Sequence, residues 1–160
     1  MQRASDIIDR VTQMVLLIVL SAMAVAVFLQ VIFRYVLNLP LFWTEEFARY
    51  CLVWSSLLGA AVAMKRGQHI AVSFFVERYP ASIRRLLSSV ALLSVAAILA
   101  VITWGGIHLV MVTRAQISPA LRLSMSIPYL AVPIGSAIML FHAIVSILYP
   151  PIGLDKQSRS

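Results

Sequence analysis

One short segment near the start of the chain combines the strongest structural signals, and it reads Phe33-Arg34-Tyr35-Val36-Leu37-Asn38-Leu39-Pro40-Leu41-Phe42-Trp43-Thr44-Glu45-Glu46-Phe47-Ala48-Arg49-Tyr50. It joins two long apolar segments, and polar, aromatic and helix-breaking residues are concentrated in it. Asn38 and Pro40 interrupt any helix that continues from the first segment. Thr44 suits the N-cap of the next helix. We therefore expect two helices joined by a short connection. Residues with a specific functional role are expected in this segment.

The charges that follow this connection have a complete structural explanation. Glu45 and Glu46 fall in the first turn of the second helix, where the helix dipole stabilises each carboxylate by roughly 0.3–1 kcal/mol. Glu45 precedes Arg49 by four residues, which favours an ion pair worth about 0.3–0.5 kcal/mol. Adjacent carboxylates diverge by about 100° around a helix, which disfavours joint acid–base catalysis. Trp43 is predicted to anchor this helix end at the membrane interface.

The composition is typical of a membrane protein. The 160 residues are 61% hydrophobic and only 12% charged, whereas a soluble domain has about 25% charged residues. A helix needs about 20 apolar residues to cross a hydrocarbon core of about 30 Å. We therefore predict a single all-α domain over 1–160. Its four transmembrane helices are expected at about 11–36, 43–64, 86–113 and 126–149.

The basic residues predict the orientation. The N-terminus, the middle loop and the C-terminus share one side of the membrane and carry nine Lys and Arg residues, against four on the other side. The positive-inside rule places both termini in the cytoplasm. Asp6 and Asp9 interrupt the basic N-terminal region, so the first segment is interpreted as a retained anchor rather than a signal peptide. The net charge of +7 fits membrane-flanking loops, and no nucleic-acid partner is expected.

Two sets of residues at helical spacing suggest contacts between helices. Gln30 would prefer a polar partner to lipid, although near the interface it could also reach water. Arg34, one turn further on, could extend to the surface. In the second segment Ser55, Gly59 and Ala63 recur every four residues, and such small residues let another helix approach closely. This face could pack within the chain or against another protein, and the sequence leaves both open.

The histidines and the single cysteine give little support for a metal or redox site. His69 has no second His or Cys near it, which favours a solvated loop histidine. It precedes an apolar segment, 70–79, that we expect to form a short helix at the cytoplasmic interface. His142 lies deep in the fourth segment and is a functional candidate by default. Cys51 excludes an internal disulfide and a cysteine metal cluster, and no cofactor is expected.

Prolines and glycines predict irregularities in the last two spans. Gly105-Gly106 is a weak point in the third. Ser126 and Pro128 suit the start of the fourth. Pro133 lies inside this helix, frees the carbonyl of the residue four positions earlier and should bend it.

The centres of the predicted spans are almost purely apolar, which bears on function. A charge at the centre of the bilayer costs about 2.5–3.5 kcal/mol on insertion scales, so it is normally retained for a reason. An autonomous homodimeric carrier is one alternative, but the first span lacks the embedded carboxylate it would need. A membrane enzyme or redox protein with His108 and His142 as metal or haem ligands is another. We favour a subunit that packs beside, and supports, a larger partner.

Short motifs extend through most of the chain. They are Phe33-Arg34-Tyr35, Trp43-Thr44-Glu45-Glu46, Ala48-Arg49, Gly59-Ala60, Lys65-Arg66-Gly67 and His69-Ile70. In this context they resemble the small permease subunit of TRAP transporters (tripartite ATP-independent periplasmic transporters), the DctQ type. One departure is Ser73, where similar proteins often carry an aspartate.

The resemblance implies a non-catalytic subunit of the bacterial inner membrane, surrounded by lipid. Such subunits pair with a large multi-span permease that holds the substrate and Na⁺ sites, while a periplasmic binding protein delivers an organic acid. The residues expected to order the outer helix ends or contact partners are Arg34, Trp43, Glu45, Glu46 and Arg49. The face expected to meet the large subunit is Ser55, Gly59 and Ala63.

Overall fold

The computed structural model describes residues 2–39, 41–67 and 81–148, and these are almost entirely helical. The helices are α1 (Gln2–Tyr35), α2 (Phe42–Gly67), α4 (Ala81–Val112), α5 (Ser126–Tyr129) and α6 (Ala131–Leu148), with the 3₁₀ turn η1 (Thr113–Ala115) after α4. Four helical stretches are long and apolar enough to cross a membrane. The prediction of an all-helical protein with four such helices is confirmed. The interfacial helix expected at 70–79 lies outside the described residues.

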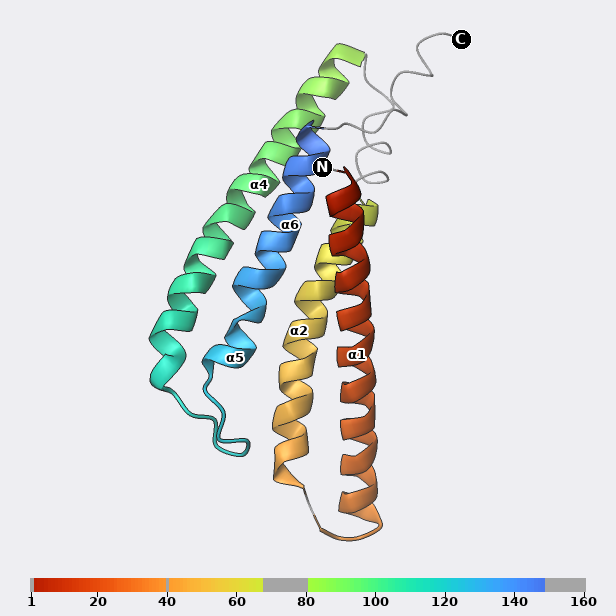
Figure 1. The fold of residues 1–160 in the computed structure, drawn as a ribbon, viewed down its shortest axis with the longest axis vertical. Helices are drawn as coiled ribbons and strands as arrows, with labels where there is room; N and C mark the ends of the chain where they lie inside the picture. Colours follow the sequence, from red (N-terminus) through yellow and green to blue (C-terminus); the bar gives the residue numbers. More distant parts are fainter. Residues whose placement is uncertain (1, 40, 68–80, 149–160) are drawn as a thin grey trace.

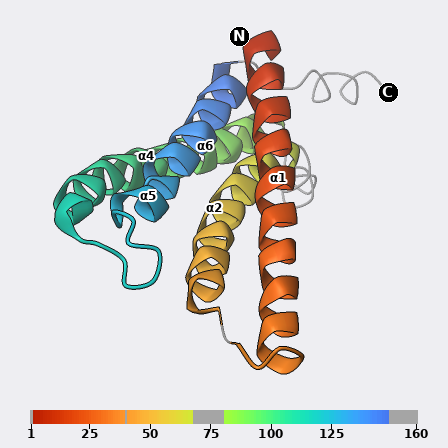
Figure 2. The same ribbon diagram turned by 60° about the horizontal axis from the view of Figure 1, so that its bottom comes forward.

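The helices form an open row in the order α1, α2, α6, α4 (Figures 1 and 2). Helices α2 and α6 each pack between two neighbours, whereas α1 and α4 lie at the two edges. Only 6% of the most apolar part of α1 and 11% of that of α4 is buried, compared with 28% for α2 and 39% for α6. A row of this kind leaves both edge helices open to lipid or to a partner.

Different helix ends and loops lie at the two ends of the row. At one end lie the start of α1 and the end of α6, and we call this the terminal end (Figure 1). At the other lie the α1–α2 connection and the α4–α5 loop, residues 113–125, and we call this the loop end. Along α1 and α2 the charged residues lie toward these two ends.

Two glycines allow the central helices to approach closely. A Cβ atom added to Gly135 would lie 2.8 Å from the Cβ of Leu57, which brings α6 against α2. A Cβ added to Gly106 would lie 3.0 Å from the ring of Pro133, which brings α4 against α6. Small residues at helix contacts are what membrane packing requires, because dispersion contacts rather than hydrophobic burial hold helices together in lipid.

The last span is interrupted as the sequence predicts. It begins with Ser126 in α5, and Leu130 separates α5 from α6. Pro133 has no N–H to donate to the carbonyl of Tyr129, so the helix cannot continue its regular hydrogen bonds through this point. The regular pattern resumes when the N–H of Ile134 donates to the carbonyl of Leu130 at 3.2 Å.

One local expectation is wrong. Helix α2 begins at Phe42, so Thr44 lies within its first turn and is not the N-cap. Its hydroxyl is completely buried and donates to the carbonyl of Leu41 at 2.7 Å instead of accepting from a backbone N–H. Helix α4 continues through Gly105-Gly106 to Val112, and the weak point expected there stays a prediction. Pro133 of α6 approaches the backbone of α4 closely at Gly106.

Candidate functional site

Glu46 connects α2 to the α4–α5 loop at the loop end. The residue is only 8% exposed. Its Oε2 accepts the backbone N–H groups of Ala120 at 2.8 Å and Leu121 at 3.0 Å, and the hydroxyl of Tyr50 donates to its Oε1. Tyr50 also lies 3.4 Å from the sulfur of Met125, further along the same loop. Hydrogen bonds to an ionised group are roughly twice as strong as neutral ones, so Glu46 is the main tether of this loop.

The α4–α5 loop has a defined conformation of its own. The N–H of Ser118 donates to the carbonyl of Leu123 at 2.8 Å, and the N–H of Met125 donates to the carbonyl of Gln116 at 2.9 Å. The hydroxyl of Ser118 accepts the N–H of Leu123 at 3.2 Å. Arg122, at the turn, has a φ of 53°, in the left-handed region. The loop therefore forms a small, hydrogen-bonded hairpin that presents Arg122 to solvent.

Glu45, the neighbouring carboxylate, behaves differently. It forms the predicted ion pair with Arg49, with 3.3 Å between Oε1 and the guanidinium nitrogen. Both side chains are about two-thirds exposed, at 66% and 67%. An exposed pair of this kind contributes little to stability. Only one of the two adjacent glutamates, Glu46, therefore connects separate parts of the chain.

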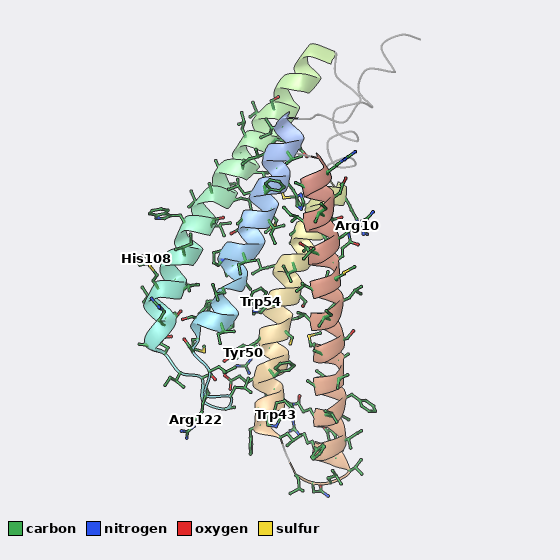
Figure 3. All side chains as sticks on the ribbon, in the orientation of Figure 1. Arg10, Trp43, Tyr50, Trp54, His108 and Arg122 are labelled. Atoms are coloured by element: carbon green, nitrogen blue, oxygen red, sulfur yellow. The ribbon has the colours of Figure 1, made fainter. Side chains whose placement is uncertain are left out.

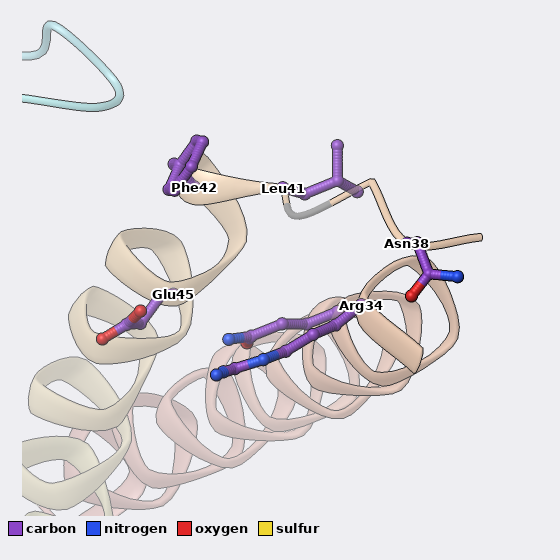
Figure 4. A pocket seen from close by; sticks show the side chains of 6 residues that line it. Arg34, Asn38, Leu41, Phe42 and Glu45 are labelled. Carbon is purple, nitrogen blue, oxygen red and sulfur yellow. The ribbon is translucent and has the colours of Figure 1, made fainter. Parts of the chain in front are cut away.

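A pocket of about 370 Å³ lies between α1 and α2 at the loop end (Figure 4). Its lining residues are Gln30, Arg34, Asn38, Leu41, Phe42 and Glu45. The guanidinium of Arg34 lies 5.8 Å from the ring centroid of Tyr35, within the range of a cation–π contact. The structure thus brings the predicted residues Gln30, Arg34 and Glu45 to one site, whereas Glu46 lies elsewhere.

Trp43 projects from the first turn of α2, and Tyr50 and Trp54 follow along the same helix (Figure 3). The ring of Trp43 packs edge-on against Phe47, with 6.5 Å between centroids, and the residue is 42% exposed. Its role as an interface anchor stays a prediction.

The predicted small-residue face does not act as a unit within the chain. Ser55 is buried, and its hydroxyl donates to the carbonyl of Leu52. A Cβ added to Gly59 would meet no atom of the described residues within 4 Å, and Ala63 is exposed. The close contact of α2 with α6 is made by Leu57 instead. Gly59 and Ala63 are therefore available to another protein or to lipid.

His142 belongs to a polar cluster at the terminal end. It is 2% exposed, and its Nδ1 lies 3.0 Å from the hydroxyl of Ser5 in α1. The Lys65 ammonium of α2 donates to the carbonyl of Ser5 at 3.0 Å and to Asp6 at 2.8 Å. The cluster therefore joins α1, α2 and α6.

Asp9 completes this cluster. One of its carboxylate oxygens accepts from the side-chain amide of Gln13 at 2.7 Å and lies 3.7 Å from Lys65. The other oxygen, and Nε2 of His142, are buried without a hydrogen-bond partner in the described part of the protein. The sequence signal for this cluster is the recurrence of Ser5, Asp9 and Thr12 at helical spacing, which forms one polar stripe on α1.

The geometry gives no support for a shared metal or haem site. Among the residues described, no three His, Cys, Asp or Glu side chains are close enough together to hold a metal ion. His108 is exposed near the loop end of α4 (Figure 3), whereas His142 contacts Ser5 at the terminal end. These two histidines therefore cannot ligate one group. His69 lies outside the described residues.

Comparison with known proteins finds relatives that are all named as TRAP transporter permease proteins. The sialic acid TRAP transporter small permease protein SiaQ of Vibrio cholerae is 28% identical over 144 residues, covering 88% of this chain and 82% of that protein. A putative TRAP transporter small permease protein of Haemophilus influenzae is 32% identical over 80 residues, half of each chain. The isethionate TRAP transporter permease protein DctMQ of Oleidesulfovibrio alaskensis is 32% identical over 99 residues.

The coverage of these matches differs. The match to the isethionate permease covers 61% of this chain but only 16% of that longer protein. Residues 23–150 match the family described as tripartite ATP-independent periplasmic transporters, DctQ component. This range includes Glu46 at the loop end, Gly59 and Ala63 on α2, and His142 of the terminal-end cluster. The resemblance seen in the sequence is thereby confirmed, and the chain belongs to the DctQ family of TRAP transporter components.

Proposed function

We propose that this chain is the non-catalytic small membrane subunit of a TRAP-type secondary transporter. It braces a large permease subunit that imports an organic acid together with Na⁺, and a periplasmic binding protein delivers that acid. The observation that carries the proposal is the open row of helices. Both edge helices are almost entirely unburied within the chain, and such large apolar surfaces need lipid or protein to cover them.

The charge distribution supports a bracing role rather than autonomous transport. Ion-coupled carriers keep ionisable groups deep in the membrane, where they bind the transported species. In the described residues, the charged groups with contacts lie near the two ends of the row, as Glu46 and Lys65 illustrate. The longer isethionate permease, of which this chain matches only 16%, supports the association of a small segment with a much larger permease.

We place the loop end in the periplasm and the terminal end in the cytoplasm of a bacterial inner membrane. The support is the excess of basic residues on the side that holds the termini. In this orientation the pocket around Arg34 and the loop that carries Arg122 face the side from which a binding protein would approach.

We assign the exposed face of α2 around Gly59 and Ala63 to the large subunit. The open space beside Gly59 supports this, since a partner helix could come close to the backbone there. Ser55 belongs to the interior of the chain.

The test is a mild detergent pull-down of the tagged chain from its native membrane, with mass spectrometry of the proteins that accompany it. A large multi-span permease in one-to-one ratio is the expected result. Recovery of the chain alone, as a homodimer that moves solute in liposomes, would instead establish the autonomous carrier.

The same pull-down tests the contact face. Gly59→Leu should abolish recovery of the large permease while the chain stays folded, because no atom of the described residues occupies the space beside Gly59. Ala97→Leu adds the same side chain on an exposed position of α4 and serves as the control. Equal recovery with Gly59→Leu and the wild-type chain would remove the contact-face assignment.

A further inference from the structure

We propose that Glu46 is a positioning residue, which fixes the α4–α5 loop so that Arg122 meets a carboxylate on a soluble protein partner. The inference deepens the proposed function and rests on it for the side of the membrane on which that partner lies. It assigns separate roles to the two residues: Arg122 makes the contact, and Glu46 acts through the loop.

The positions of the hydrogen bonds carry the argument. Glu46 accepts the N–H groups of Ala120 and Leu121, the two residues that directly precede Arg122. Arg122 has a φ of 53°, which is uncommon for residues other than glycine. Such conformations persist where the surroundings enforce them, and they cluster at functional sites. The buried carboxylate of Glu46 supplies that constraint from a different element.

The charges at the loop end indicate the chemistry of the partner. The exposed cations there, among the described residues, are Arg34, Arg49, Arg114 and Arg122. Glu45 is the exposed carboxylate that opposes them, since Glu46 is buried. Complementary charge steers association and suppresses wrong partners, so this end fits a surface rich in Asp and Glu.

The order of the loop favours a protein over lipid headgroups. Ile117 and Leu123, on the two arms of the small hairpin, are 70% and 41% exposed, and Leu123 directly follows Arg122. A fixed cation beside apolar side chains gives affinity through preorganisation, which benefits a partner of fixed shape. Lipid headgroups are fluid and adjust to a mobile loop as well as to a fixed one, so an ordered loop gives no advantage in binding them.

The experiment uses the transporter complex in nanodiscs and the binding protein that accompanies it in the pull-down, with affinity measured for four versions of the chain. Arg122→Gln should weaken binding about tenfold, the size expected for a lost charge contact. Glu46→Gln should weaken it by a similar factor although it makes the loop end more positive. Glu45→Gln, which changes the charge equally without touching the loop, should leave affinity unchanged or raise it.

The sign of the Glu46→Gln effect is decisive. If Glu46→Gln tightens binding as Glu45→Gln does, only net charge matters and the positioning role is wrong. If Arg122→Gln leaves affinity for the binding protein intact but lowers binding to phosphatidylglycerol nanodiscs, the loop recognises lipid instead. Recovery of the large permease without a soluble partner overturns this inference alone, whereas recovery of neither overturns the proposed function.

Discussion

The two polar clusters, one at each end of the helix row, are built differently. At the loop end, Glu46 receives hydrogen bonds from two backbone N–H groups and from Tyr50. At the terminal end, Lys65 and His142 connect three helices through Ser5 and Asp6 of α1, and one oxygen of Asp9 and Nε2 of His142 have no hydrogen-bond partner among the described residues. The loop-end cluster orders a loop, whereas the terminal-end cluster determines how helices assemble.

This difference shows how a protein with apolar spans obtains a specific structure. Apolar helix surfaces in lipid pack without strong preference for one neighbour. Polar groups near the interface must find partners, because leaving a buried donor or acceptor unpaired costs about 1–3 kcal/mol. The cost of leaving polar groups unpaired therefore selects helix neighbours at one end and a loop conformation at the other.

The largest effect is expected at Lys65. Lys65→Met removes the cation that bridges Asp6, Asp9 and the carbonyl of Ser5, and it should lower the free energy of unfolding by about 3 kcal/mol because Asp9 is left largely buried. The measurement is unfolding by SDS in mixed micelles. Arg66→Met removes the same charge one residue further on, from an exposed side chain, and should cost under about 0.5 kcal/mol. Equal losses of unfolding free energy in the two variants would contradict a specific role of Lys65 in the terminal-end cluster.

Glu46→Ala should produce a local effect on the α4–α5 loop, because it deletes the acceptor for two backbone N–H groups. Hydrogen exchange at the amides of Ala120 and Leu121 should become roughly thirtyfold faster, while the amides of α2 and α6 keep their protection. Glu45→Ala is the matched control and should not alter exchange in the loop. Loss of protection throughout the row would show that the loop end, too, determines helix assembly.

His142→Leu should cost about 1 kcal/mol, because it leaves the buried hydroxyl of Ser5 without its partner. Combining it with Ser5→Ala removes both polar groups, and the double variant should recover part of that loss. The SDS unfolding titration used for Lys65 reports both variants. Additive losses would mean that the hydroxyl and the imidazole do not stabilise each other.

The smallest effect is expected for the exposed pair. A double-mutant cycle with Glu45→Gln and Arg49→Gln should give a coupling of about 0.3–0.5 kcal/mol, which falls in high salt. A coupling as large as the Glu46 effect would remove the contrast between the two adjacent glutamates.

Much of the helix content could be predicted from sequence, since apolar length and helix-breaking residues are local properties. The break in the last span follows from the missing N–H of Pro133. The extension of α1 back to Gln2 was harder to predict, because Asp6 and Asp9 resemble a solvated flank until their partners are known. Glu45 and Glu46 were indistinguishable for the same reason.

Four apolar helices, the positions of their polar ends and the family to which the chain belongs all follow from local properties of the sequence. The open row of helices, the bond of Glu46 rather than Glu45 to the α4–α5 loop, and the contact of His142 with Ser5 arise only when the chain is folded. These contacts join residues 74 and 137 positions apart. Helical periodicity gives the face of each side chain, but the neighbour it meets depends on how the close approaches at Gly106 and Gly135 arrange the helices.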